Sequence, residues 1–168
     1  TTDLDNADRL VARHGERFLY CAPWNRFLIY DEKRWRPDDS QGMDRLAEET
    51  VRSIVDEVQS VQDEDAAGKL LKWAYDSRND FRIRAMLNRV KAKRPVTPDE
   101  LDPDSTRWLF NVANGTIDLK TGELLPHDRK RRITRLSNVV FDPAAKCPIW
   151  ERILDRSFAG NEPLKDYF

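Results

Sequence analysis

The sequence predicts an α+β fold: a helical bundle, two small antiparallel β-meanders that flank it, and a C-terminal helix that leads into a further domain. Apolar residues recur at every third or fourth position from residue 43 to residue 61, which is the period of an amphipathic helix. Short aromatic and β-branched runs, separated by turn residues, stand before and after this helical region. The composition supports a folded core, because 39% of the 168 residues are hydrophobic and five of them are tryptophan.

These patterns divide the chain into an α+β domain at 1–145 and a linker helix at 146–168. Within the domain we expect a helix and a β-meander at 1–42, helices at 43–94, and a β-meander with an additional strand at 95–145. The first helix should cover Leu4–His14, with the side chain of Thr2 or Asp3 as its N-cap. The first meander should then comprise Phe18–Cys21, Phe27–Tyr30 and Lys33–Arg36.

Three helices are expected next. The first buries one apolar stripe, formed by Met43, Leu46, Ala47, Thr50, Val51, Ile54, Val55, Val58 and Val61. The second starts near Asp65 and turns inward Leu70, Leu71, Ala74 and Tyr75. The third starts after Asn79 or Asp80, ends before Pro95, and turns inward Ile83, Met86, Leu87 and Val90.

The remaining elements follow from turn and capping residues. Thr97–Glu100 has the residues of a capping box and predicts one helical turn. Asn114 and Gly115 both tolerate the positive φ of a type I′ turn, and Thr121-Gly122 reverses the chain again. The second meander should therefore comprise Phe110–Ala113, Thr116–Leu119 and Glu123–Leu125.

After this meander we expect a strand at Ile133–Phe141 and an amphipathic helix that uses Ile149, Ile153, Leu154 and Phe158. A further helix could run from Asn161 to Phe168. The chain would then continue in the intact protein, where Leu164, Tyr167 and Phe168, partly exposed here, would be covered.

Several strings resemble one family of replication proteins. The segment Asn111–Glu123, followed by Pro126-His127-Asp128, looks like the domain immediately upstream of the superfamily III helicase in phage and plasmid primase–helicases. It is also similar to the corresponding region of poxvirus helicase–primases. The same resemblance extends, in order, to Asn6–Leu10, Trp24–Asp31, Arg34-Trp35 and Phe141–Trp150.

The resemblance implies a non-catalytic domain that serves DNA replication of a mobile element. It would bind DNA, or assemble and position the adjacent helicase as a ring. The implied partners are single-stranded or forked DNA, the helicase domain and further copies of the protein. The parent polypeptide would be an ATP-dependent helicase with primase activity, so that ATP and magnesium belong to the helicase domain and no cofactor is expected in this chain.

The residues themselves predict no catalytic site. None of the six glycines belongs to a Gly-x-x-x-x-Gly-Lys-Ser/Thr loop, which a helicase motor needs to hold nucleotide phosphates. Asp118 is expected to cap a turn and not to bind a metal, and His14 and His127 have no neighbouring ligand for zinc. We expect Cys21 and Cys147 to be reduced, buried thiols, with a disulfide as the less favoured alternative. The sequence has no membrane-spanning run or signal peptide, which predicts a cytoplasmic protein.

The charge pattern indicates where DNA could bind. The net charge is only −1, yet residues 38–66 carry a balance of −8, residues 78–94 one of +6, and residues 127–135 one of +4. Clustered Arg and Lys side chains neutralise phosphates and release counterions. The candidate contacts are Arg129, Lys130, Arg131, Arg132 and Arg135 in one cluster, and Arg78, Arg82, Arg89 and Lys93 in the other. Trp24, Trp35 and Trp108 could stack on bases, although aromatic core is the favoured assignment for each.

Three alternatives remain open at this stage. The basic clusters could be solvated surface, or the basic helix could pair with the acidic one. Three helices followed by a hairpin is also the order of a winged helix, which would make the domain a sequence-tolerant DNA-binding module. Finally, the domain could be a structural linker or oligomerisation module without DNA contact.

Overall fold

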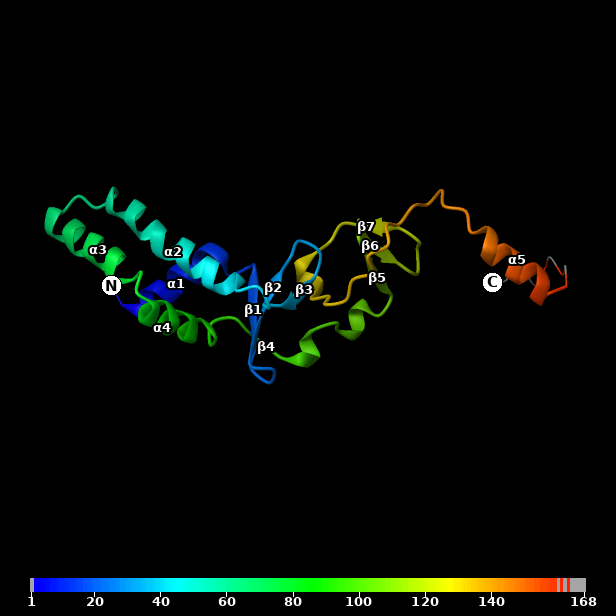
Figure 1. The fold of residues 1–168 in the computed structure, drawn as a ribbon, viewed down its shortest axis with the longest axis horizontal. Coiled ribbons are helices and arrows are strands. Elements are labelled where there is room, and N and C mark those ends of the chain that lie inside the picture. Colours follow the sequence, from blue (N-terminus) through cyan, green and yellow to red (C-terminus); the bar gives the residue numbers. More distant parts are fainter. Residues whose placement is uncertain (1, 160, 162, 164–168) are drawn as a thin grey trace.

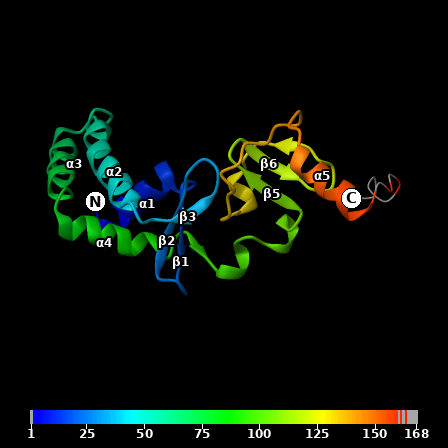
Figure 2. The ribbon, with the colours of Figure 1, turned by 45° about the vertical axis from the view of Figure 1, so that its right-hand side comes forward.

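The structure, a computed structural model, describes residues 2–159, 161 and 163. In Figure 1 the molecule is elongated, with a lobe of helices at one end, two small sheets next to it, and helix α5 (Pro148–Ser157) at the other end. Figure 2 shows the same order of parts from another direction. The predicted α+β class is confirmed.

The helical lobe consists of α1 (Asp3–His14), α2 (Gly42–Val58), α3 (Glu64–Asp76) and α4 (Asp80–Val90). Thr2 and Asp5 form a capping box at the start of α1. Helix α1 packs against α2 and α4, and α3 packs against α2. Their shared core comprises Ala7, Leu10, Phe18, Met43, Leu46, Ala47, Val51, Met86 and Val90.

The expected helices are present, with two local corrections. Helix α2 ends at Val58, so Val61 falls outside it. Its first amides are capped from before the helix by Asp38, whose carboxylate accepts from Gly42 N at 2.7 Å and from Met43 N at 2.8 Å. Leu71 and Tyr75 were expected to point inward but are exposed, because α3 packs on α2 at the edge of the lobe and buries little except Ala74.

The first sheet contains β1 (Phe18–Cys21), β2 (Arg26–Tyr30), β3 (Trp35–Pro37) and β4 (Pro95–Val96), in the order β3-β2-β1-β4. The first three strands form the predicted antiparallel meander. Strand β4 pairs parallel to β1, so the sheet is mixed. One face of the sheet contributes Phe18 and Ile29 to the core of the helical lobe, and the opposite face contributes Leu19 and Leu28 to a second core cluster.

The second sheet, β5 (Leu109–Val112), β6 (Gly115–Asp118) and β7 (Leu124–Leu125), is the second predicted meander. The expected type I′ turn is wrong. The two-residue loop is Ala113-Asn114, neither residue of which has a positive φ, and Gly115 already lies in β6. Gly115 is needed for a different reason: a Cβ there would come within 2.6 Å of the Leu125 carbonyl oxygen. At the second turn Gly122 does adopt a positive φ, of 76°.

Short 3-10 turns connect these parts. The first, η1 (Pro98–Glu100), has the predicted capping box of Thr97 and Glu100. The others, η2 (Asp104–Thr106) and η3 (Arg129–Arg131), were not expected from the sequence.

The strand expected at Ile133–Phe141 is not formed. This segment runs beside β5 with only scattered backbone bonds, from Ser137 N to Asn111 O and from Ala113 N to Val139 O, each 2.9 Å long. Helix α5 follows it, with Leu154 buried and Ile149 and Ile153 exposed. Leu164, Tyr167 and Phe168, with most of the helix expected from Asn161 to Phe168, lie outside the described residues.

Candidate nucleic-acid interface

The segment 129–135, here called the basic segment, begins as the 3-10 turn η3. The Asp128 carboxylate caps this turn by accepting from Lys130 N at 2.9 Å. The turn ends at Arg132, which adopts the left-handed conformation with a φ of 54°. The segment therefore has a defined backbone path, although it forms no regular helix or strand.

Three backbone contacts attach this path to the first sheet and to the loop after η1. The indole of Trp35 in β3, which is only 3% exposed, donates to the Arg129 carbonyl oxygen at 2.8 Å, and the Trp35 amide donates to the Ile133 carbonyl oxygen at 2.8 Å. The amide of Asp102 donates to the Arg132 carbonyl oxygen at 3.0 Å. The cations of the segment are thus held in place before any ligand arrives.

Single carboxylates neutralise part of the segment. Arg129 pairs with Glu16, Arg132 pairs with Glu100 at 2.5 Å, and Arg135, whose side chain is 90% exposed, lies 3.9 Å from Asp102. These acidic partners come from two other parts of the chain, residue 16 and residues 100–102, which the sequence pattern could not reveal.

The other two cations of the segment have no acidic partner in the described part of the chain. Arg131 donates to the Pro126 carbonyl oxygen at 3.2 Å, and Lys130 has neither an ion pair nor a side-chain hydrogen bond. Glu100 is held ionised. Its pKa lies below the ordinary 4.5, chiefly because the Thr97 amide donates to its carboxylate and next because Arg132 does.

A hollow of about 340 Å³, here called the basic hollow, opens beside the segment. Its charged lining consists of four cations and one carboxylate: Arg94, Arg129, Lys130, Arg132 and Glu16. Leu19 and Trp35 supply its apolar lining. Arg94 comes from the other predicted basic stretch, so the fold brings the end of residues 78–94 against the basic segment.

Arg94 is the functional candidate that sequence reasoning passed over, because it only flanked the expected helical face. Its carbonyl oxygen accepts from the amide of Tyr20 in β1 at 2.8 Å, which fixes its backbone immediately before β4. Its Nε is buried and has no hydrogen-bond partner among the described residues. Pro95 follows Arg94 directly and cannot continue a helix, and it was the only signal of this position in the neighbouring sequence.

Helix α4 and the turn after it are less suited to DNA than expected, because Arg82 of α4 and Lys93, which lies beyond the end of α4 at Val90, turn toward α1. Arg82 pairs with Asp3 at 3.3 Å and stacks on the Trp73 ring at 4.2 Å, and Lys93 pairs with Asp8 at 2.5 Å. The acidic partner of the basic helix is therefore α1 and not the acidic α2. Of the other two candidates, Arg78 lies 4.8 Å from the Tyr75 ring and Arg89 is exposed.

The three tryptophans have different surroundings. Trp35 belongs to the core and cannot stack on a base, because it is 3% exposed. Trp24, at the tip of the β1–β2 hairpin, is 47% exposed, and Trp108 is 45% exposed. Arg107 and Lys120 lie 5.4 and 5.8 Å from the Trp108 ring.

Comparison with known families now places this chain. A family model described as D5 N terminal like matches residues 7–159, which is nearly all of the sequence. The chain belongs to the D5 N-terminal-like family. This family is the N-terminal domain of D5-like primase–helicases of phages and poxviruses, so the predicted family is confirmed and the domain has its place in a replication protein. No curated protein matches the chain.

In this D5 N-terminal-like domain the two asparagines of the Asn111–Glu123 string have structural roles. The Asn111 side chain is 4% exposed, and its Nδ2 donates to the carbonyl oxygens of Lys33 and Arg135 at 3.0 Å each. Its Oδ1 accepts from the Thr116 hydroxyl at 2.9 Å and lies 2.9 Å from His127 Nδ1. Asn111 therefore ties the second sheet to the end of the basic segment.

Asn114 acts in the same way one turn later. Its side chain exchanges two hydrogen bonds of 2.9 Å with the backbone of Phe141. Asp118 caps the following turn, as expected, by accepting from Lys120 N at 2.9 Å.

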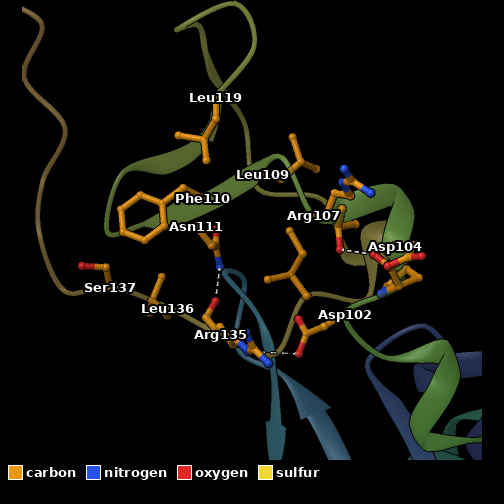
Figure 3. Close-up of a pocket in the computed structure, with 13 residues that line it drawn as sticks. Asp102, Asp104, Arg107, Leu109, Phe110, Asn111, Leu119, Arg135, Leu136 and Ser137 are labelled. Atoms are coloured by element: carbon orange, nitrogen blue, oxygen red, sulfur yellow. Dashed lines mark hydrogen bonds and ion pairs between the residues drawn. The ribbon is translucent and has the colours of Figure 1, made fainter. Parts of the chain in front are cut away.

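Figure 3 shows the hollow on the other side of this junction, which has a volume of about 680 Å³. Phe110 of β5 and Leu119, which follows β6, line this hollow together with Leu136, and the Arg135 guanidinium lies 3.9 Å from Asp102 at its edge. Residues 129–132 thus border the basic hollow, while residues 133 and 135–137 border this larger, more apolar one.

The domain departs from a winged helix. After α4 the chain enters the first sheet as β4 and passes through η1 and η2 before it reaches β5. The helical lobe packs against the first sheet through α2 and β2, whereas the β5–β6 hairpin belongs to the second sheet. This connection does not favour the winged-helix alternative.

The basic hollow, with its four cations, is suited to bind an anion. Within the described part of the chain no three His, Cys, Asp or Glu side chains converge as a metal site requires, and no helix is both long and apolar enough to span a bilayer. Both cysteines are free thiols; Cys21 is buried as expected, whereas Cys147, which was also expected to be buried, is exposed.

Proposed function

We propose that this D5 N-terminal-like domain binds the phosphate backbone of DNA with its basic segment and so guides the strand toward the helicase domain of its parent protein. The observation that carries the proposal is the basic hollow, where four cations face a single carboxylate on a backbone that is fixed in advance. Membership of a primase–helicase family supports DNA as the anion.

The partly paired state of the segment is compatible with this role. Exposed ion pairs contribute little net stability, because water and salt screen them. A phosphate oxygen can therefore replace the carboxylate of Glu16, whose side chain is 72% exposed, at small cost. Helix α4 and the turn after it are expected to contribute less, since their paired cations also hold α4 against α1.

The proposal is tested by replacing Arg129, Lys130, Arg131 and Arg132 together with Ala and measuring the binding of labelled single-stranded, forked and duplex DNA. We expect loss of most of the binding, and a wild-type affinity that falls by about 10-fold or more between about 50 and 200 mM salt. The matched control removes the same charge from exposed cations of the helical lobe that are not candidate contacts: Arg13, Lys69, Lys72 and Arg84.

The control variant should retain most of its affinity. Equal losses in the two variants would mean that only net charge matters, and unchanged binding in the first variant would refute the role of the basic segment. A urea unfolding curve for each variant verifies that the fold is retained.

A second function, contact with another part of the parent protein or with another copy, is favoured by the second sheet. The cross-strand neighbours Phe110, Ile117 and Leu124 share one face, and Phe110 and Leu124 are 48% and 38% exposed. The opposite face buries the polar side chains of Asn111 and Thr116. This is the reverse of the usual pattern for a sheet with one solvated face, and an exposed apolar face indicates a protein contact.

This second function predicts that Phe110→Glu weakens assembly of the full-length protein, or its docking to the helicase domain, while the isolated domain still binds DNA. Phe81→Glu is the control, because Phe81 is 76% exposed and belongs to α4, a helix that lies far from the second sheet in Figure 1. Sedimentation of both full-length variants measures assembly. An unaltered sedimentation profile for Phe110→Glu would remove the second sheet from consideration.

A further inference from the structure

We infer that the basic hollow is a built site for one phosphate group of a nucleic-acid strand, and that Arg94 is its central ligand. This inference rests on the proposed DNA binding and makes it more specific, since Arg94 lies outside the basic segment. The ligand is either an internal phosphodiester or a terminal phosphate, which share the same oxygen chemistry.

Arg94 is held at the hollow by its backbone. Its backbone is fixed next to β1 by the hydrogen bond from Tyr20 N, and its side chain lines the hollow. Its buried Nε has no acceptor in the part of the chain that the structure describes. Buried donors of native proteins are nearly always paired, so an unpaired one indicates a missing acceptor. Arg94 also has no acidic partner among the described residues, and a phosphate in the hollow that its side chain lines would neutralise its charge.

The basic segment forms the side of the hollow opposite Arg94. Arg129, Lys130 and Arg132 line the hollow from residues more than thirty positions further along the chain. Two contacts fix their backbone: the Trp35 indole holds Arg129, and the Asp102 amide holds Arg132. Guanidinium groups match the geometry of phosphate oxygens with paired N–H donors, and an ammonium adds a compact charge.

A single carboxylate, that of Glu16, lies among the cations of the hollow. Among the described residues Glu16 is the only acidic side chain in its lining, and Glu100 pairs with Arg132 from outside. A phosphate presents more acceptor oxygens than a carboxylate, and so it can bridge Arg94 and the opposite wall where Glu16 meets Arg129 alone. Glu16 would then act as an internal competitor for the site.

Two apolar core residues complete the lining of the hollow. Leu19 and Trp35 are 4% and 3% exposed and belong to the second core cluster. They give the site a rigid, poorly hydrated side on which charge-assisted hydrogen bonds are stronger than in open water. A volume of about 340 Å³ lies in the range of small-ligand pockets and admits a phosphate with its adjoining sugar.

The experiment measures fluorescence anisotropy of one single-stranded oligonucleotide, with and without a 5′-phosphate, against the domain and three variants. Arg94→Gln removes the charge, Arg94→Lys keeps the charge without the Nε donor, and Arg84→Gln is the control, because Arg84 on α4 is exposed. We expect Arg94→Gln to weaken binding about 10-fold and to lower the salt slope by about one. Arg94→Lys should fall between wild type and Arg94→Gln, and Arg84→Gln should change affinity less than about 2-fold.

The comparison of the oligonucleotides with and without a 5′-phosphate distinguishes a terminal phosphate from an internal phosphodiester. If Arg94→Gln abolishes a preference of the domain for the 5′-phosphorylated strand, the hollow binds a terminal phosphate. If Arg94→Gln weakens both strands equally, it binds an internal phosphodiester. Either result supports the inference.

Wild-type affinity and salt slope in Arg94→Gln would overturn the inference. The proposed function would survive that result, provided that the fourfold Ala variant of the basic segment still loses binding. An independent readout is the NMR signal of the Arg94 Nε–H group, assigned by its loss in Arg94→Gln. This signal should shift when the oligonucleotide is added, and an unmoved signal at saturating oligonucleotide would contradict a direct contact whether or not the variant folds normally.

Discussion

The indole Nε1 of Trp35 donates a hydrogen bond of 2.8 Å to the carbonyl oxygen of Arg129. This bond connects a residue of the second core cluster directly to the first cation of the basic segment. An aromatic side chain that could have stacked on a base thus has a different use: it fixes the backbone that presents the cations.

Trp35→Phe should therefore weaken both folding and DNA binding. The substitution leaves the Arg129 carbonyl oxygen without its donor and opens space beside the buried ring, which should lower the free energy of unfolding by about 2–4 kcal/mol. Urea unfolding measures the first effect and oligonucleotide binding the second. Trp24→Phe serves as the control, with less than about 0.5 kcal/mol expected, because Trp24 is 47% exposed.

The Asn111 side chain should be more important for stability than that of Asn114. Asn111→Ala leaves two carbonyl oxygens and the buried Thr116 hydroxyl without their partner, which should cost about 2–4 kcal/mol. Asn114→Ala removes two exposed bonds to Phe141 and should cost about 1 kcal/mol. Thermal and urea unfolding of both variants compares them, and equal losses would contradict the role of Asn111 as the junction of the second sheet.

Removing the competing carboxylate should strengthen DNA binding. Glu16→Gln frees Arg129 and removes the only acidic side chain from the lining of the basic hollow, so affinity at low salt should rise about 3-fold or more. Glu64→Gln, at the exposed start of α3, makes the same change in net charge. If both variants gain equally, the gain reflects overall charge and not the hollow.

His14 should make folding stability depend on pH. Burial lowers the pKa of His14 below the ordinary 6.5, Arg17 and Arg13 lower it further, and Glu49, 3.7 Å away, opposes them. As the pH falls from about 6.5 toward this lowered pKa, the unfolded chain binds a proton that the folded chain does not, so the free energy of unfolding declines. Above about pH 6.5 both states are neutral at His14 and its contribution is constant.

Urea unfolding between about pH 8 and pH 5 measures this dependence. In His14→Gln the decline below about pH 6.5 should be smaller than in the wild type, whatever the absolute stability of the variant. Parallel curves for the two proteins would show that other groups cause the decline.

The sequence alone predicted the parts of this fold that depend on near neighbours. Apolar residues three or four positions apart identified α2 and α4, whereas the side chain of Thr2 marked the start of α1 and those of Thr97 and Glu100 marked η1. These signals act within one or two turns of the chain, so they are visible without the structure. The ordered set of motifs predicted the family for the same reason, since each motif is a local string.

Only the tertiary structure determined which charges meet. Strand β4 pairs with β1 and brings Arg94 to the basic segment, while α1 neutralises Arg82 and Lys93. Likewise, the second sheet buries Asn111 and exposes Phe110, against the usual alternation. Such contacts join residues that are tens of positions apart, and the packing of whole elements decides them. Charge counts along the chain located the cations, and packing alone selected those that remain available to a phosphate.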